Sequence, residues 1–216
     1  MHASIAAGLL LLAQLAGVAA HGYLITPKAR SYGPSDAFYD DMSGNGAGLN
    51  VVFNSNPGIC GDPFQGVPTT NFAGAIGPIQ ATYNVGATIP VTFQLTANHG
   101  GKIVMKLCPS SPASATQSCF NTYPLKRSDT GTTEYWITTG TYTGSAAVTL
   151  NYVLPAGVSC ANGCLLQWEY VAMQSCIENC ASAVCGPAYS TKYNPITGGT
   201  NMVACPVAKG PEVTEN

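Results

Sequence analysis

Apolar and polar residues alternate along much of the chain, and this alternation predicts a series of β-strands. In residues 88–95 the side chains of Ile89, Val91, Phe93 and Leu95 are separated by Pro, Thr and Gln, which is the pattern of a strand with one buried face. Pro90 places this strand at a sheet edge or near a strand start. Similar patterns predict strands at residues 79–83, 102–108, 134–138, 146–153, 165–172 and 201–207. Short strands with frequent turns predict a mainly β fold, an immunoglobulin- or fibronectin-III-like β-sandwich.

The remaining segments carry turn-forming residues. Residues 31–77 are rich in Gly, Asn, Pro and Asp and predict long loops, with one short helix at 36–42. Asn84-Val85-Gly86 predicts the turn of a hairpin between residues 79–83 and 88–95. The polar residues 209–216 predict a frayed tail. We therefore expect a single domain over residues 21–208.

Residues 1–20 resemble a secretory signal peptide. Residues 5–18 are apolar apart from Gly8, Gln14 and Gly17, and Val18 and Ala20 are the small residues that a signal peptidase requires. The apolar run is too short for a membrane span, so we expect no membrane anchor. Cleavage after Ala20 would yield a secreted, extracellular protein with His21 as its first residue.

The composition narrows the classes of function. Only 8% of the residues are charged and the net charge is −2, which argues against the basic surface that binding of nucleic acid requires. The 9 cysteines behind a signal peptide indicate disulfides rather than a zinc cluster, and we expect one disulfide between Cys108 and Cys119. An odd number leaves one thiol free, buried or paired with another chain. We expect a monomer.

His21 and His99 are the histidines that remain after such cleavage, and together they predict a metal site. An amino-terminal histidine offers both its α-amine and its Nδ1 to one metal ion, and nitrogen ligands favour Cu²⁺ among the divalent first-row metals. His99 follows directly after a predicted strand and would add a ring nitrogen. Copper must displace protons from these groups, so its affinity should fall in acid. The alternatives are a cleavage site that merely precedes a histidine, and a structural histidine at a strand end.

Several motifs of the chain resemble those of the lytic polysaccharide monooxygenases, a family of copper enzymes. They are His21-Gly22-Tyr23-Leu24 with Pro27 and Arg30, Ile59-Cys60-Gly61-Asp62, Ala97-Asn98-His99, and Cys164-Leu165-Leu166-Gln167-Trp168. The motifs occur in the family's order. The chain most resembles the compact oomycete branch implicated in pectin cleavage, followed by the insect-type branch that acts on chitin and cellulose.

The resemblance implies roles for particular residues. His21 and His99 would bind one copper ion. Gln167 would lie beside the oxygen that the copper activates, although a solvent-exposed or strand-bridging amide is an equal alternative. Trp168 lies on the opposite face of the same strand and is expected in the core, because side chains alternate along a strand.

The carboxy-terminal part departs from the family pattern. A Tyr or Phe is expected at the axial copper position shortly before the last cysteine, where this chain has Met202. Tyr189 and Tyr193 lie upstream of it. We expect Tyr193 to take the axial position, with Tyr189 and Met202 as alternatives.

The resemblance also implies the reaction and its partners. An external electron donor would reduce the copper, O₂ or H₂O₂ would react with it, and a carbon of the glycosidic linkage would be oxidised, so that the polysaccharide breaks. Lys28, Arg30 and Lys102 are close to the histidines in sequence and predict a basic rim that attracts an anionic plant cell-wall polysaccharide, with pectin (homogalacturonan) as the best candidate. Alternatively, nearby aspartates neutralise Lys28 and Arg30.

The alternatives are other substrates, a binding protein, a hydrolase and a blue-copper protein. Activity on chitin or cellulose keeps the same copper chemistry, and a non-catalytic carbohydrate-binding protein keeps the same fold. A hydrolase would need paired carboxylates, and the acidic residues form no convincing pair. A blue-copper site would need a Cys and a Met near the histidines, which the sequence does not provide.

Overall fold

The computed structural model describes residues 21–29, 44–45, 78–98, 100–111, 114–137, 147–161, 163–172 and 212–215. Their strands form two antiparallel sheets. One sheet has the order β1-β3-β7-β5, from His21–Thr26, Thr88–Ala97, Ala147–Val153 and Lys126–Arg127. The other has the order β2-β9-β8-β4-β6, from Gly44–Asn45, Glu212–Glu215, Leu165–Ala172, Lys102–Cys108 and Glu134–Trp136.

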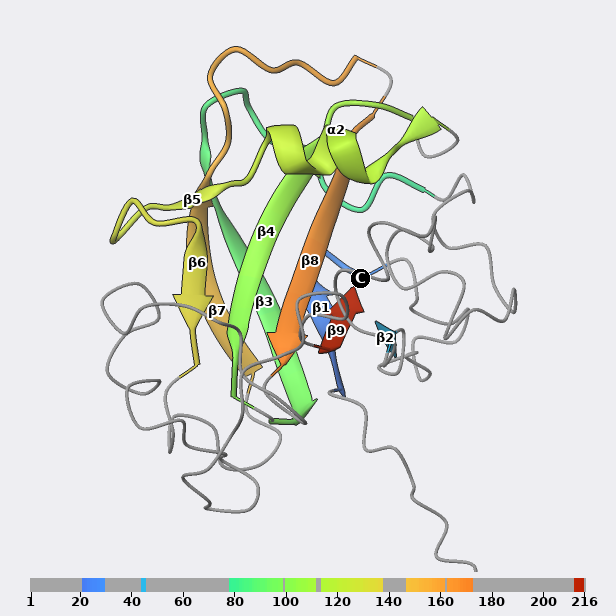
Figure 1. Cartoon of the computed structure of the whole chain (residues 1–216). Helices are drawn as coiled ribbons and strands as arrows, with labels where there is room; N and C mark the ends of the chain where they lie inside the picture. Colours follow the sequence, from blue (N-terminus) through green and yellow to red (C-terminus); the bar gives the residue numbers. More distant parts are fainter. Residues whose placement is uncertain are drawn as a thin grey trace, which may run out of the picture.

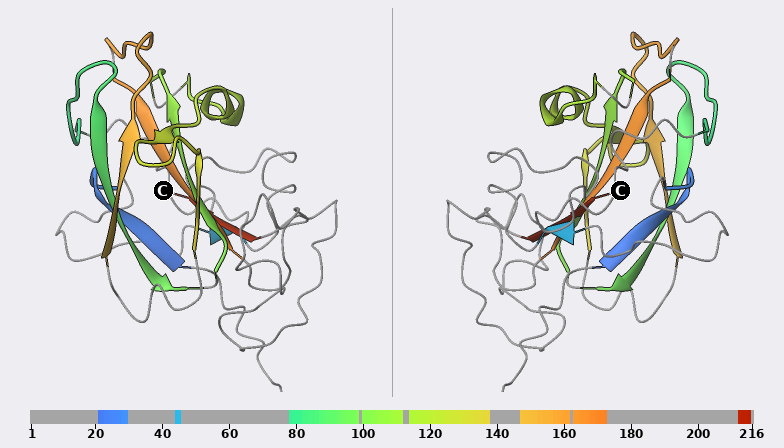
Figure 2. Two further views of the ribbon diagram at one scale, coloured as in Figure 1. Left: turned by 90° about the vertical axis from the view of Figure 1, so that its left-hand side faces the viewer. Right: turned by 90° about the vertical axis from the view of Figure 1, so that its right-hand side faces the viewer.

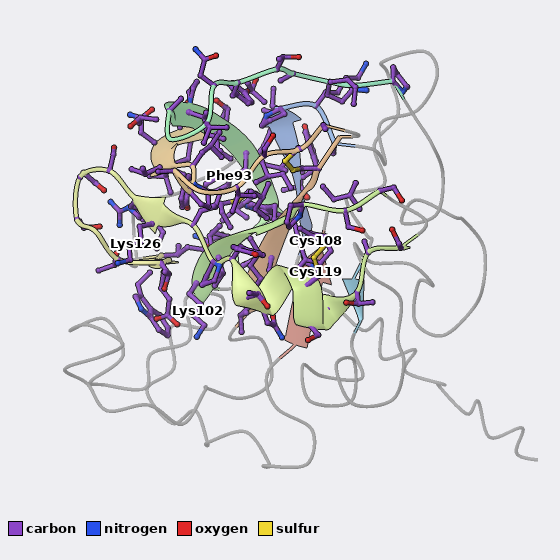
Figure 3. The ribbon with its side chains drawn as sticks, turned by 90° about the horizontal axis from the view of Figure 1, so that it is seen from above. Phe93, Lys102, Cys108, Cys119 and Lys126 are labelled. Carbon is purple, nitrogen blue, oxygen red and sulfur yellow. A yellow bond between two sulfur atoms is a disulfide. The ribbon has the colours of Figure 1, made fainter. Side chains whose placement is uncertain are left out.

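The sheets pack face to face as a β-sandwich (Figure 1), and the side views show them as two layers (Figure 2). The predicted mainly β sandwich is thereby confirmed. In β3 the predicted apolar face is buried, from Ile89 at 1% exposed to Phe93 at 0%. Phe93 packs across the sandwich on Trp168 of β8, with ring centroids 5.8 Å apart, and Figure 3 shows it among the side chains between the sheets.

The central strands of the second sheet are buried on both faces. Every residue of β4 is buried, and β8 is nearly so. On the face away from the sandwich core, Lys106 of β4 forms a 2.7 Å ion pair with Glu169 of β8. Lys102 forms a second one, also 2.7 Å long, with Glu134 of β6. Charged side chains are buried at low cost only when they are paired in this way.

Several strand predictions are confirmed and one is wrong. β4 and β8 have the predicted bounds, and β7 starts one residue later than predicted. Residues 79–83 form no strand, since Ile79 is 68% exposed and pairs with no neighbouring strand. Only the turn after it is present, with Gly86 at φ 75°. Pro90 lies near the start of β3. The pairing of β1 with β3 reaches back only to Thr92, so β1 does not pair with Pro90.

The polar carboxy-terminal segment was expected to fray, and this expectation is wrong for four of its residues. Glu212–Glu215 form β9, which pairs with β8 and with β2. The main-chain hydrogen bonds of a β-ladder do not require apolar side chains, so a polar segment can add a strand to a sheet edge. The predicted helix at 36–42 and the predicted strand at 201–207 lie outside the described residues.

A short helix, α2, was not predicted. It spans Gln117–Thr122 and begins inside the loop that the Cys108–Cys119 disulfide closes, with Cys119 in its first turn. Thr116 caps it by accepting the backbone N–H of Cys119 at 3.1 Å. Figure 3 shows the two sulfur atoms next to the helix. A second disulfide joins Cys160 to Cys164, so these two cysteines belong to the disulfide framework. Among the described residues no helix is long and apolar enough to cross a membrane.

Candidate metal centre

The pairing of β1 with β3 determines where His21 lies. The Cα register places His21 opposite Ala97, at the end of both strands. Ala97 is two residues before His99 in the sequence. The side chain of His21 and the whole of His99 lie outside the described residues, but the backbone of His21 and both chain neighbours of His99 are described. The sheet therefore brings the segments that carry the two predicted ligands to one end of the sandwich.

Beyond its backbone pairing, β1 is attached to β3 through a side chain. Tyr23 donates its hydroxyl hydrogen to Oε1 of Gln94 at 2.9 Å, and these two residues are partners in the register. Tyr23 is 8% exposed. A cross-strand hydrogen bond of this kind resists slippage of the register, so it helps to hold His21 opposite Ala97.

Gly22 is required by close packing at the start of β1. A Cβ atom at this position would lie 2.8 Å from the carbonyl oxygen of Gln94 and 2.8 Å from Cη2 of Trp168. Such distances are too short for carbon atoms in contact. Only glycine lets β1 approach both β3 and the core tryptophan so closely. The sequence showed this glycine within a motif but did not show what it contacts.

The residues on either side of His99 are fixed by a polar side chain and two glycines. Gly100 donates its backbone N–H to Oδ1 of Asn98 at 2.9 Å, so this hydrogen bond spans His99. Gly100 and Gly101 have φ values of 65° and 95°, in the left-handed region that glycine adopts without strain. The carbonyl oxygen of Gly101 accepts the backbone N–H of Ile137 at 2.9 Å. The segment around His99 is therefore anchored on both sides of the histidine.

These features fit a copper ion better than other metals. The donors that the register brings to one end of the sandwich are nitrogens, because the α-amine of His21 would begin β1 and His99 follows β3. Nitrogen donors suit Cu²⁺ best among the divalent first-row ions. Within the described parts of the chain, no group of three or more His, Cys, Asp or Glu side chains is placed to hold a metal.

Gln167 and Trp168 lie on opposite faces of β8, as the strand period predicts. Trp168 is fully buried in the core and contacts Gly22. Gln167 is also fully buried, but on the other face, where its amide exchanges two hydrogen bonds with the amide of Gln117 at 3.0 and 3.2 Å. These contacts join β8 to α2. The amide is therefore neither solvent-exposed nor bridged to another strand, and a role beside activated oxygen stays a prediction.

Gln117→Ala is expected to lower the free energy of unfolding by about 1–3 kcal/mol, because it leaves the buried amide of Gln167 without its partner. Urea unfolding followed by tryptophan fluorescence measures this change. Asn121→Ala is the matched control, since Asn121 lies on the same helix and only accepts an exposed hydrogen bond from Gln117. Equal stability of the two variants would contradict a structural role of the amide pair.

Lys102 does not contribute a free positive charge to the predicted basic rim. It is 9% exposed, its ammonium group pairs with Glu134, and it lies 5.1 Å from the ring centroid of Trp136. This part of the rim prediction is wrong, because strand alternation turns Lys102 to the outer face of the second sheet. Lys28 is half-buried. Arg30 and the axial candidates Tyr189, Tyr193 and Met202 lie outside the described residues.

A family model described as lytic polysaccharide mono-oxygenase, cellulose-degrading, matches residues 21–182. No curated protein sequence matches the chain significantly. Among solved structures, a lytic polysaccharide monooxygenase AA15 from Thermobia domestica in the Cu(I) state is similar, with a TM-score of 0.62 and 25% sequence identity. The alignment covers 91% of this chain and 95% of that one.

Proposed function

The chain belongs to the lytic polysaccharide monooxygenase family, whose members are copper-dependent enzymes that oxidise polysaccharides, and we propose that His21 and His99 hold its copper ion. The observation that carries this proposal is the register of β1 against β3, which places His21 opposite Ala97, two residues before His99. The ligands would be the α-amine and Nδ1 of His21 and a ring nitrogen of His99. We propose Tyr193 for the axial position, with Tyr189 and Met202 as alternatives.

The backbone of β1 and the chain around His99 would each position one part of the copper site. When bound, copper would supply the redox chemistry with O₂ or H₂O₂, after reduction by an external donor, that oxidises a carbon of the glycosidic linkage. The α-amine of His21 must lose its proton to bind, and its position follows the backbone of β1. The hydrogen bond between Asn98 and Gly100 holds the turn around His99. Three protein ligands would leave coordination positions open for a substrate, as catalytic metal sites require.

We propose that residues 1–20 are a signal peptide and that the mature, secreted protein starts at His21. Cleavage there is needed because an amide nitrogen cannot replace the neutral amine as a ligand. The Cys108–Cys119 and Cys160–Cys164 disulfides support this route, since disulfides form and persist in oxidising compartments. Residues 21–208, extended by β9 at Glu212–Glu215, would form the catalytic domain, active as a monomer.

We propose a plant cell-wall polysaccharide as the substrate, with pectin (homogalacturonan) as the first candidate. The support is the resemblance of the motifs to the pectin-active branch and the positions of Lys28 and Arg30 close behind His21. Cellulose is the substrate in the description of the matching family model, so cellulose and chitin are the alternatives. A basic rim would attract homogalacturonan less strongly as salt screens the charges.

The function is tested with protein that starts at His21 and is loaded with copper. It is incubated with ascorbate and, in separate reactions, with homogalacturonan, cellulose and chitin, and the products are analysed by mass spectrometry. Oxidised oligosaccharides from homogalacturonan are expected, in smaller amounts at high salt. Products from cellulose or chitin alone would overturn the pectin assignment. Binding to polysaccharide without oxidised products from any of the three would overturn the enzymatic function and favour a carbohydrate-binding protein.

A further inference from the structure

Strand β8 contacts both segments that carry the proposed copper ligands. Gly22, the neighbour of His21, lies against Trp168 of β8. Gly101, two residues after His99, lies against Val171 of the same strand: a Cβ at Gly101 would be 1.9 Å from the carbonyl oxygen of Val171 and 3.0 Å from Cα of Ala172. The two contacts are three residues apart on one continuous, buried strand.

We propose that β8 positions the two histidine segments relative to each other, through the contact of Trp168 with Gly22 and that of Val171 with Gly101. This inference rests on the proposed copper site and adds Gly22, Gly101 and Trp168 to it as positioning residues. The contacts are held by atoms that cannot easily move. The carbonyl oxygen of Val171 belongs to the strand backbone, and Trp168 is fully buried between Phe93 and Tyr170, with ring centroids 5.8 and 6.0 Å away.

The separation of the histidine segments matters because one proposed ligand is a backbone atom. The α-amine of His21 has no side-chain torsions with which to compensate for a shift of β1. A methyl group at Gly22 must push β1 away from the carbonyl of Gln94 or from the indole of Trp168, and His21 moves with it. A methyl group at Gly101 must likewise move the chain that follows His99 away from β8.

Two glycines of the same chain provide matched controls. At Gly157 no atom lies within 4 Å of an added Cβ, and its φ is not in the left-handed region. Gly157→Ala is therefore the control for Gly22→Ala. Gly131 has φ 71°, and an added Cβ again meets no atom within 4 Å. Gly101 has a φ of 95°, so alanine strains the backbone at both positions. Gly131→Ala is therefore the control for Gly101→Ala, because it adds this strain without a clash against Val171.

The test measures Cu²⁺ binding by calorimetry and the electron paramagnetic resonance spectrum of the Cu²⁺-loaded protein. Gly22→Ala and Gly101→Ala are expected to weaken Cu²⁺ binding by roughly 10–100-fold, the cost of disturbing groups that orient metal ligands, and to change the copper hyperfine splitting. The two controls should keep the wild-type spectrum and affinity. A general loss of stability would not by itself change the spectrum of the molecules that remain folded.

Trp168→Phe keeps a buried aromatic ring but removes the atom that contacts Gly22. It therefore tests the positioning of β1 by β8 even if Gly101→Ala does not fold. Like Gly22→Ala, it is expected to change the electron paramagnetic resonance spectrum and to weaken Cu²⁺ binding. Wild-type spectra and affinities in both Gly22→Ala and Trp168→Phe would overturn the inference.

A copper-free measurement separates this inference from the proposed function. In the metal-free protein, hydrogen exchange of the β1 amides should be faster in Gly22→Ala and Trp168→Phe than in Gly157→Ala, because β1 is displaced from β3. If the wild type binds no copper, the proposed function fails and the exchange rates still decide whether β8 positions β1. Exchange at the Gly157→Ala rate in both variants would overturn the positioning by β8.

Discussion

Protein that keeps Ala20 in front of His21 is expected to bind copper far more weakly than protein that begins at His21. The α-amine of His21 becomes an amide, which cannot act as a neutral amine ligand, and the chelate with Nδ1 is lost. Removal of a group that merely orients a ligand costs roughly 10–100-fold in metal affinity, so the loss of a ligand should cost at least that much. Calorimetric titration with Cu²⁺ measures the difference.

Thermal unfolding of the two copper-free forms is the control for the Ala20 experiment. Their midpoints should agree, because the added residue lies before the start of β1 and leaves its pairing with β3 intact. Equal copper affinity and equal oxidative activity of the two forms would rule out the α-amine as a ligand.

His99→Ala should have a comparable effect on copper and little effect on the fold. The chain on both sides of His99 is held by two hydrogen bonds that do not use its side chain, one between Asn98 and Gly100 and one between Gly101 and Ile137. We expect a loss of copper affinity of at least roughly 10–100-fold and loss of most oxidised product. Calorimetry and mass spectrometry of the products measure these changes.

The stability of the metal-free His99→Ala protein distinguishes a ligand from a structural histidine. A thermal midpoint close to that of the wild type together with lost copper binding identifies a ligand. If the variant unfolds readily but refolded material still oxidises polysaccharide, His99 is structural and the proposed site is wrong.

The sequence predicted the strands in the centre of the sheets best. In β3 the alternation is strict because one face meets the core, and β4 and β8 were predicted with their bounds although both of their faces are buried. Residues 79–83 contain the same residue types but find no partner strand, which a local pattern cannot reveal. β9 is polar and is formed by pairing with β8. Only the tertiary structure supplies that partner.

The candidate metal centre was proposed from the chemistry of its residues, and the surroundings of those residues were predicted less well. An amino-terminal histidine, a second histidine after a strand and the family resemblance together predicted copper, and the register brings the segments that carry the two histidines to one end of the sandwich. The surroundings of Gln167 could not be predicted, because its partner Gln117 lies on a helix 50 residues away in the sequence. Lys102 appeared close to His99 in sequence, yet its side chain pairs with Glu134 on the outer face. The packing of Gly22 and Gly101 on β8 likewise depends on contacts between distant parts of the chain.

The position of His21 at the first residue of β1 links metal exchange to the opening of one strand end. Among the described strands, β1 is at the edge of its sheet and pairs only with β3. The ends of such strands open and close far more often than the whole protein unfolds. If His21 and His99 bind one copper ion, each opening separates the His21 chelate from His99, and a ligand that binds only the closed form stabilises it by an amount that rises with the logarithm of its free concentration. The lifetime of the bound metal would then follow the opening rate of the first β1 residues. Bound copper would in turn keep this end of β1 paired with β3.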